Sequence, residues 1–190
     1  MLPHALLKQA HVRLFGMIND GMLDSFLRQF ASVQDTHSPL LLELTTLGGE
    51  ADTARRIAED IRLFITHFGG DLYFIGKTAV YSAGVTIMSA FPVERRFLSA
   101  DATLLIHERR MEKPLNLSGP LHVCEAMLRD ALSEVSTGKR LQDEDFRKLV
   151  AGSDVGIDEL KQRLATGSWY LSAPDALERK LIGGIVGGTA

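Results

Sequence analysis

Short apolar runs alternate with helical patterns along the first half of the chain, and this alternation restricts the fold more than any other feature. Residues 40–44 form an almost unbroken leucine run, residues 51–67 repeat apolar side chains at helical spacing, and residues 71–75 form a second apolar run. Strands separated by one helix pair in parallel through right-handed crossovers. The leucine-rich run is typical of a strand covered on both faces. The sequence therefore predicts an α/β fold with a largely parallel sheet.

The rest of the chain extends this arrangement. We expect further strands at residues 12–15, 103–106, 169–171 and 185–186, and further helices that begin near Asn19, Ser82, Leu121, Ile157 and Ser172. The helix from Leu121 carries an apolar stripe formed by Leu121, Cys124, Leu128, Ala131, Leu132 and Val135. Gly138 is expected to interrupt this helix before the helical spacing resumes at Phe146. With 190 residues and no internal repeat, the chain is expected to form a single domain, residues 1–190.

The formal net charge of −3 argues against a protein that binds nucleic acid by neutralising phosphates. The arginines occur as three separate pairs, which we expect to lie on solvated faces: Arg55-Arg56, Arg95-Arg96 and Arg109-Arg110. The single cysteine, Cys124, cannot form an intramolecular disulfide, and its apolar helical position predicts a small buried side chain. No apolar run is long enough for a membrane span, and the first ten residues lack a signal-peptide pattern. We therefore expect a cytoplasmic protein that binds neither membrane nor nucleic acid.

Ser82 and His107 are the strongest candidates for chemistry. Ser82 follows an apolar run and opens a short helix, whose N-terminus offers free N–H groups beside the hydroxyl. His107 ends the strand expected at residues 103–106. A serine and a histidine held in this way can act as nucleophile and general base. The same two residues also fit an ordinary helix cap and a surface histidine, so the pair alone does not decide.

The double glycine Gly48-Gly49 lies between a strand and a helix. Glycines there allow positive φ or close approach of the backbone to another group. Three roles remain open: a simple bend, an anion cradle, or an extended backbone that donates an N–H group to an oxyanion hole beside Ser82. The N–H of Ala83 is the candidate second donor. The spacing matches no nucleotide-binding glycine motif.

Four segments, in this order, resemble the proteolytic subunit of the Clp protease, ClpP, in the crotonase-like superfamily. Residues 41–61 resemble the strand, Asn-Ser-Pro-Gly-Gly loop and helix of that family, although this loop reads Thr-Leu-Gly-Gly. Residues 76–90 resemble its nucleophile segment, and residues 97–110 resemble the segment that ends in Met-Ile-His. Residues 169–186 resemble its Phe-Leu-Ser-Ala signature.

The resemblance implies specific roles: Ser82 is the nucleophile, His107 the general base, and Gly49 and Ala83 the donors of the oxyanion hole. It implies a serine-type endopeptidase that cleaves short or unfolded polypeptides and needs no metal or organic cofactor. The position of the triad aspartate is occupied here by Ser168. What orients His107 is therefore left open, and neither Asp154 nor Asp158 has a predicted place near it.

The resemblance also implies a spiral of βαβ units with a handle-like helical segment at residues 112–150, after a short N-terminal arm at residues 1–11. Members of the family form rings and receive substrate from a partner ATPase. We therefore expect a ring-type homo-oligomer, with the apolar helix after Leu121 either as an inter-ring contact or as an ordinary core helix. The short arm weakens the expectation of an ATPase unfoldase partner.

Other functions are compatible with the same residues. A catalytically weakened or inactive ring subunit would explain Ser168. A crotonase-type acyl-CoA enzyme is less well supported, because Glu50 is the only acid beside Gly49. A generic α/β-hydrolase is weaker still, since Val80 occupies the first glycine position of GxSxG. Lys77 is an alternative base for Ser82, although His107 fits better.

Overall fold

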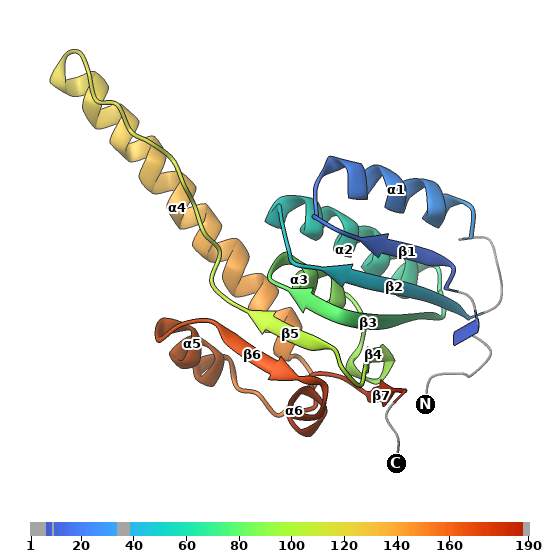
Figure 1. The fold of residues 1–190 in the computed structure, drawn as a ribbon. Coiled ribbons are helices and arrows are strands. Elements are labelled where there is room, and N and C mark those ends of the chain that lie inside the picture. The colour runs from blue at the N-terminus through green and yellow to red at the C-terminus, as the bar shows by residue number, and fades with distance from the viewer. Residues whose placement is uncertain (1–6, 9, 34–38, 188–190) are drawn as a thin grey trace.

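A computed structural model describes residues 7–8, 10–33 and 39–187, so most of the predicted N-terminal arm, residues 1–11, lies outside the described residues. In chain order the elements are β1 Val12–Phe15, α1 Asp20–Ala31, β2 Leu40–Thr46, α2 Ala51–His67, β3 Leu72–Tyr81, α3 Ala83–Met88, a 3₁₀ turn Val93–Arg95, β4 Arg96–Ser99, β5 Thr103–Ile106, α4 Leu121–Val150, α5 Ile157–Ala165, β6 Trp169–Ser172, α6 Ala173–Glu178 and β7 Gly184–Val186. Figure 1 shows α1, α2 and α3 against one side of the sheet, and α4 projecting from the body.

The sheet is parallel except at one strand, which confirms the predicted α/β class. The main path runs β1-β2-β3-β4-β7, while β5 pairs with β3 and the antiparallel β6 pairs with β5. The long strand β3 serves two neighbours: residues 74–76 pair with β4, and residues 79–81 pair with β5. Thr78, between these two segments, has a φ of 60°. Because of this change of partner, the end of β3 lies beside β5. Ser82 directly follows β3, and His107 directly follows β5.

The two faces of β2 differ, and the expectation that both are covered is only partly correct. Leu40, Leu42 and Leu44 point into the main core beneath the helices. On the other face, Leu41 packs with Ile75 and Phe97 in a second, smaller cluster. Next along that face, Glu43 forms a half-exposed ion pair with Lys77 at 2.7 Å. Apolar cover on the second face is therefore local.

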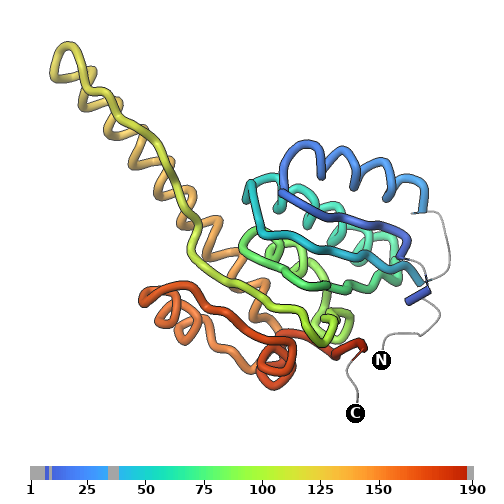
Figure 2. The backbone as a smooth tube through the Cα atoms, viewed as in Figure 1, coloured from blue at the N-terminus to red at the C-terminus, as the bar shows by residue number. Residues whose placement is uncertain are grey.

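Helix α4 runs without a break, so the predicted interruption at Gly138 is wrong. A glycine inside a helix costs about 1 kcal/mol relative to alanine, which a helix of 30 residues tolerates. Cys124 is half-buried, not buried as predicted. Most of the predicted apolar stripe is exposed, with Leu121 at 87% and Leu132 at 66%, so this part of α4 is not a core helix, whereas Phe146 and Leu149 near its end are buried in the core. Figure 2 shows the segment after β5 running alongside α4, and Lys113 bonds Glu134 across the two at 2.5 Å.

Arg96 opens β4, a strand that the sequence analysis did not predict. Its side chain is only 2% exposed, so the expectation of a solvated arginine pair at 95–96 is wrong for this residue. The guanidinium donates to five backbone carbonyls, those of Ser89, Phe91, Lys148, Leu149 and Leu181. Burial lowers the pKa of Arg96 to about 10, so the group stays protonated at neutral pH. One side chain thus connects the end of α3, the last turn of α4 and the segment before β7.

Replacing Arg96 with methionine should destabilise the fold by roughly 3–5 kcal/mol, because the change leaves several buried carbonyls without a donor. The measurement is the free energy of unfolding in urea. Arg129→Met is the control, since Arg129 is 75% exposed and bonds only Glu125 on its own helix, a pair worth less than about 0.5 kcal/mol. Equal losses in the two variants would contradict the role given to Arg96.

Candidate active site

Ser82 occupies a strained backbone turn between β3 and α3. Its φ is 56° and its ψ is −120°, a region that residues with a side chain rarely adopt. The backbone is fixed on both sides: Ser82 N–H donates to the carbonyl of Leu105 at 2.8 Å, and Ser82 C=O accepts from Val85 at 2.9 Å. The side chain makes no capping hydrogen bond with α3. Ser82 thus occupies the N-cap position of α3 without a side-chain capping bond, so its hydroxyl does not stabilise the helix in the way that an ordinary serine cap does.

The double glycine lies against this turn, and both glycines have conformations that require the absence of a side chain. Gly48 has a φ of 107°, and a Cβ there would lie 2.8 Å from the Cβ of Ser82. Gly49 has a φ of 147°, and a Cβ there would lie 2.2 Å from the carbonyl oxygen of Ile18. The glycines thus allow the loop to pass between Ile18 and Ser82, which is more than a simple bend.

The backbone hydrogen bonds around Gly49 leave its N–H group directed away from β1. Ile18 donates to the carbonyl of Gly48 at 3.0 Å and accepts from Glu50 at 2.9 Å, as in a parallel bridge. Since the N–H groups of an extended chain alternate in direction, that of Gly49 points to the opposite side. Within the described part of the chain, neither the Gly49 nor the Ala83 amide donates to a protein acceptor. Both residues line one cavity together with Ser82.

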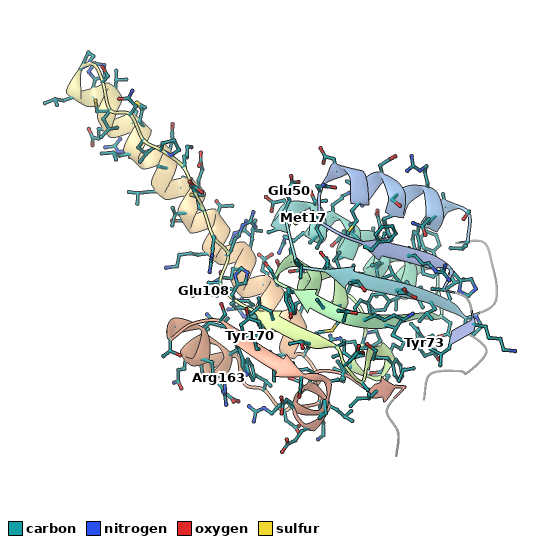
Figure 3. All side chains as sticks on the ribbon, viewed as in Figure 1. Met17, Glu50, Tyr73, Glu108, Arg163 and Tyr170 are labelled. Carbon is teal, nitrogen blue, oxygen red and sulfur yellow. The ribbon has the colours of Figure 1, made fainter. Side chains whose placement is uncertain are left out.

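This cavity has a volume of about 600 Å³, within the range of small-ligand sites. It lies at the carboxyl ends of the parallel strands, where open α/β sheets bind their ligands. Ser82, Ala83, Gly49 and His107 all line it. Its apolar wall consists of Val85, Ile106, Phe146 and Leu149, and its polar wall includes Glu50, Asp52, Arg109, Arg110, Gln142 and Asp145. Figure 3 shows Glu50 and Glu108 at the end of the sheet from which α4 projects.

His107 is half-buried directly after β5, and its Nδ1 lies 2.6 Å from the carbonyl oxygen of Glu108. A carbonyl oxygen only accepts, so Nδ1 must carry a proton in this contact. In the neutral imidazole, Nε2 is then left with the lone pair that a general base needs. The structure thus places His107 in the same cavity as Ser82, with Nδ1 in contact with a carbonyl oxygen.

Ser168 directly precedes β6 and is exposed. The last pair of the β5–β6 ladder is Ile106 with Trp169, so one further step in the same register brings Ser168 opposite His107. None of the hydrogen bonds found among the described residues involves Ser168. Ser168 therefore lies opposite His107 in the ladder, but its hydroxyl does not supply the contact to Nδ1, which is made by Glu108.

The other predicted alternatives lie elsewhere. The Lys77 ammonium pairs with Glu43 on the opposite face of β2 and does not line the cavity, which argues against a lysine base. Asp154 pairs with Lys180 at 3.0 Å and does not line the cavity either, nor does Asp158. These positions leave His107 as the candidate base beside Ser82.

Of the arginine pairs expected on solvated faces, Arg109-Arg110 lines the cavity, whereas Arg56 is exposed as expected and Arg55 reaches a cavity residue without lining the cavity itself. Arg55 is a half-buried partner of Asp145 and donates to Glu144 at 3.0 Å. Burial raises the pKa of the Asp145 carboxyl, an effect that the Arg55 guanidinium opposes. Arg109 bonds Asp52 at 2.6 Å, and its Nη1 has no hydrogen-bond partner among the described residues.

Sequence reasoning missed Arg109, Gln142 and Asp145 as residues of the site. The signal that could have indicated Gln142 and Asp145 is their helical spacing. In a helix they lie on the same face as the apolar Phe146 and Leu149, and polar side chains on such a core-facing side indicate a site. Among the described residues, no group of three or more His, Cys, Asp or Glu side chains is arranged to hold a metal ion. Nor does any described helix combine the length and apolarity that crossing a membrane requires.

The fold and cavity define an α/β protein with a strained serine at a strand-to-helix turn. The profile of the Clp protease family matches residues 2–119, more than half of the chain, and the chain belongs to this family. Among solved structures, it is similar to that of a ClpP1 mutant from Listeria monocytogenes, with 18% sequence identity and a TM-score of 0.71. That match covers 99% of this chain and 97% of the other, and at this identity it shows the fold alone. No curated protein sequence matches the chain.

Gly48→Ala should lower the free energy of unfolding by about 1–3 kcal/mol, because the added Cβ meets Ser82 and the positive φ becomes strained. Gly138→Ala is the matched control, since a Cβ there meets no described atom within 4 Å apart from the adjoining backbone of its own helix. In the middle of α4 this second change should stabilise the protein by roughly 0.5–1 kcal/mol. Urea unfolding of both variants makes the comparison. A shift of the same sign in both would refute the close approach of Gly48 to Ser82.

Proposed function

We propose that the chain is a serine-type endopeptidase that hydrolyses peptide bonds of short or unfolded polypeptides through an acyl-enzyme on Ser82. The observation that carries the proposal is the serine itself: Ser82 is held in a strained turn, makes no capping bond, and lines one cavity with His107. Strained backbone with an unused hydroxyl is typical of a nucleophile. Membership of the Clp protease family supports a peptidase.

The proposed chemistry begins when Nε2 of His107 takes the proton of the Ser82 hydroxyl, whose oxygen attacks the substrate carbonyl carbon. The amides of Gly49 and Ala83 donate to the oxygen that becomes negative. The imidazolium then gives its proton to the leaving amine, and an acyl-enzyme forms. Water, deprotonated by the same imidazole, releases the acid product. No step requires a metal or organic cofactor.

The cavity favours an extended polypeptide as substrate. A space of about 600 Å³ accommodates part of an unfolded chain and excludes a folded domain. Its apolar wall around Phe146 and Leu149 suits a hydrophobic side chain beside the scissile bond. The polar wall, with Arg109, Arg110 and Gln142, offers donors for the backbone carbonyls of such a substrate.

Self-association into a ring-type homo-oligomer is part of the proposal. The exposed apolar side chains along α4 support it, since large exposed apolar patches mark interaction sites. Residues 112–150, which include the extended segment beside this helix, form the proposed handle-like segment. An ATPase unfoldase is the proposed partner by family membership alone.

A second function has one specific observation in its favour. Ser168 is exposed and takes no part in the hydrogen bonds found among the described residues, so the position that carries the triad carboxylate in the family gives His107 no support here. The chain would then be an inactive ring subunit with a structural role. The labelling experiment below separates these two functions.

Labelling with a fluorophosphonate probe should modify the wild-type protein at Ser82. Ser82→Ala and His107→Ala should each lower labelling by at least about 10³-fold, as expected for residues that act as one unit. His67→Ala is the control, because His67 is exposed at the end of α2. Intact mass and gel fluorescence give the readout. Labelling is measured from about pH 6, near the ordinary pKa of histidine, up to about pH 9. If the wild-type protein stays unlabelled over this whole range, only the structural function is left.

Ser168→Asp should raise the labelling rate at least about tenfold, because a carboxylate opposite His107 stabilises the imidazolium and is worth up to about 10⁴ in kcat in the serine-protease triad. Ser168→Asn is the control, since it matches the aspartate in shape but carries no charge. Peptide hydrolysis and probe labelling are measured at the same pH. Equal rates in the two variants would show that position 168 does not face the imidazole.

A further inference from the structure

One peptide unit, that between Glu108 and Arg109, takes part in two hydrogen bonds at once. Its carbonyl oxygen accepts from Nδ1 of His107 at 2.6 Å. Its N–H group donates to Oε1 of Gln142 at 2.5 Å. Gln142 lies on α4, 33 residues further along the chain, and lines the cavity. A continuous chain of hydrogen bonds therefore runs from the imidazole through this peptide unit to Gln142.

Gln142 also fixes the position of the peptide unit. Without a partner from α4, residues 108 and 109 would follow β5 as an unpaired extended segment, because they belong to no strand or helix. The Arg109 side chain bonds Asp52 at 2.6 Å, which connects the same residue to the first turn of α2. The segment is thus held from both α2 and α4, and its carbonyl stays directed at His107.

The hydrogen bond to Gln142 strengthens the contact with His107 as well as placing it. An acceptor on the N–H side of an amide draws the proton and increases the negative charge on the carbonyl oxygen. Hydrogen bonds in such chains reinforce one another by about 10–30% per bond. The carbonyl then accepts more strongly from Nδ1–H, which favours the tautomer that keeps Nε2 free as a base.

We propose that Gln142 is a positioning residue that, through the Glu108–Arg109 peptide unit, holds His107 in the Nδ1–H tautomer at the position where its family uses a carboxylate. The proposal rests on the function proposed above. The peptide unit differs from a carboxylate in one respect: its dipole orients the imidazole but stabilises the positive charge of the imidazolium less than a full negative charge does. The tautomer should therefore be well defined while the reaction stays slow.

The test compares Gln142→Met with Gln142→Glu in the full chain. Methionine keeps the length of the side chain and removes the acceptor, whereas glutamate retains it. Gln162→Met is the control, because Gln162 is exposed on α5 and does not line the cavity. The first readout is the pair of ¹⁵N shifts of the His107 imidazole, assigned by difference from His107→Ala. The second is the labelling rate at saturating probe.

Gln142→Met should move the ¹⁵N shifts towards a mixture of tautomers and slow labelling about five- to tenfold, the effect of one lost hydrogen bond. Gln142→Glu and Gln162→Met should keep the wild-type shifts and at least half of the rate. The proposal is overturned if Gln142→Met retains the wild-type shifts, or if Gln142→Glu changes them equally. If the wild type does not label, the proposed function fails, but the ¹⁵N shifts still decide the role of Gln142.

Discussion

The buried guanidinium of Arg96 is the interaction on which the position of the site depends. Among the described residues, no carboxylate is one of its hydrogen-bond partners. Five carbonyls from three parts of the chain hold it instead. Carbonyls at helix ends have no intrahelical donor, so Arg96 satisfies them where water has no access. The end of α3 and the base of α4 are thereby fixed together. Since α3 follows Ser82 and the base of α4 carries Gln142 and Phe146, this single side chain relates the two halves of the cavity.

A second constraint is the conformational strain at Ser82. Positive φ at a serine persists only where the surroundings fix it. Here the carbonyl of Leu105 holds the Ser82 amide, and Gly48 leaves the space that the side chain occupies. The split of β3 between β4 and β5 brings these groups together, because it directs the end of the strand towards β5. Fold and reactivity are therefore connected at the point where the sheet changes its pairing.

The proposed base, His107, has a backbone carbonyl at its Nδ1 where a serine-protease triad has a carboxylate. A carboxylate in the serine-protease triad fixes the histidine tautomer and stabilises the imidazolium. In this chain the Glu108 carbonyl can do the first of these, with Gln142 behind it, while no group among the cavity residues does the second for His107. The peptidase proposed above would, on this division, be slow.

The sequence by itself predicted the α/β class, most of the strands and helices, and the candidates Ser82, His107, Gly49 and Ala83, because periodicity and turn residues are local signals. It did not predict β4, since the strand opens on an arginine whose burial is decided by carbonyls up to 85 residues away. It placed a break at Gly138, where the length of α4 outweighs the cost of one glycine. Gln142 could not be predicted, because its role depends on a peptide unit 33 residues upstream that only the packing of α4 against the segment after β5 brings within hydrogen-bond distance. Local chemistry was therefore determined by the sequence, whereas the partners of buried polar groups were decided by the tertiary structure.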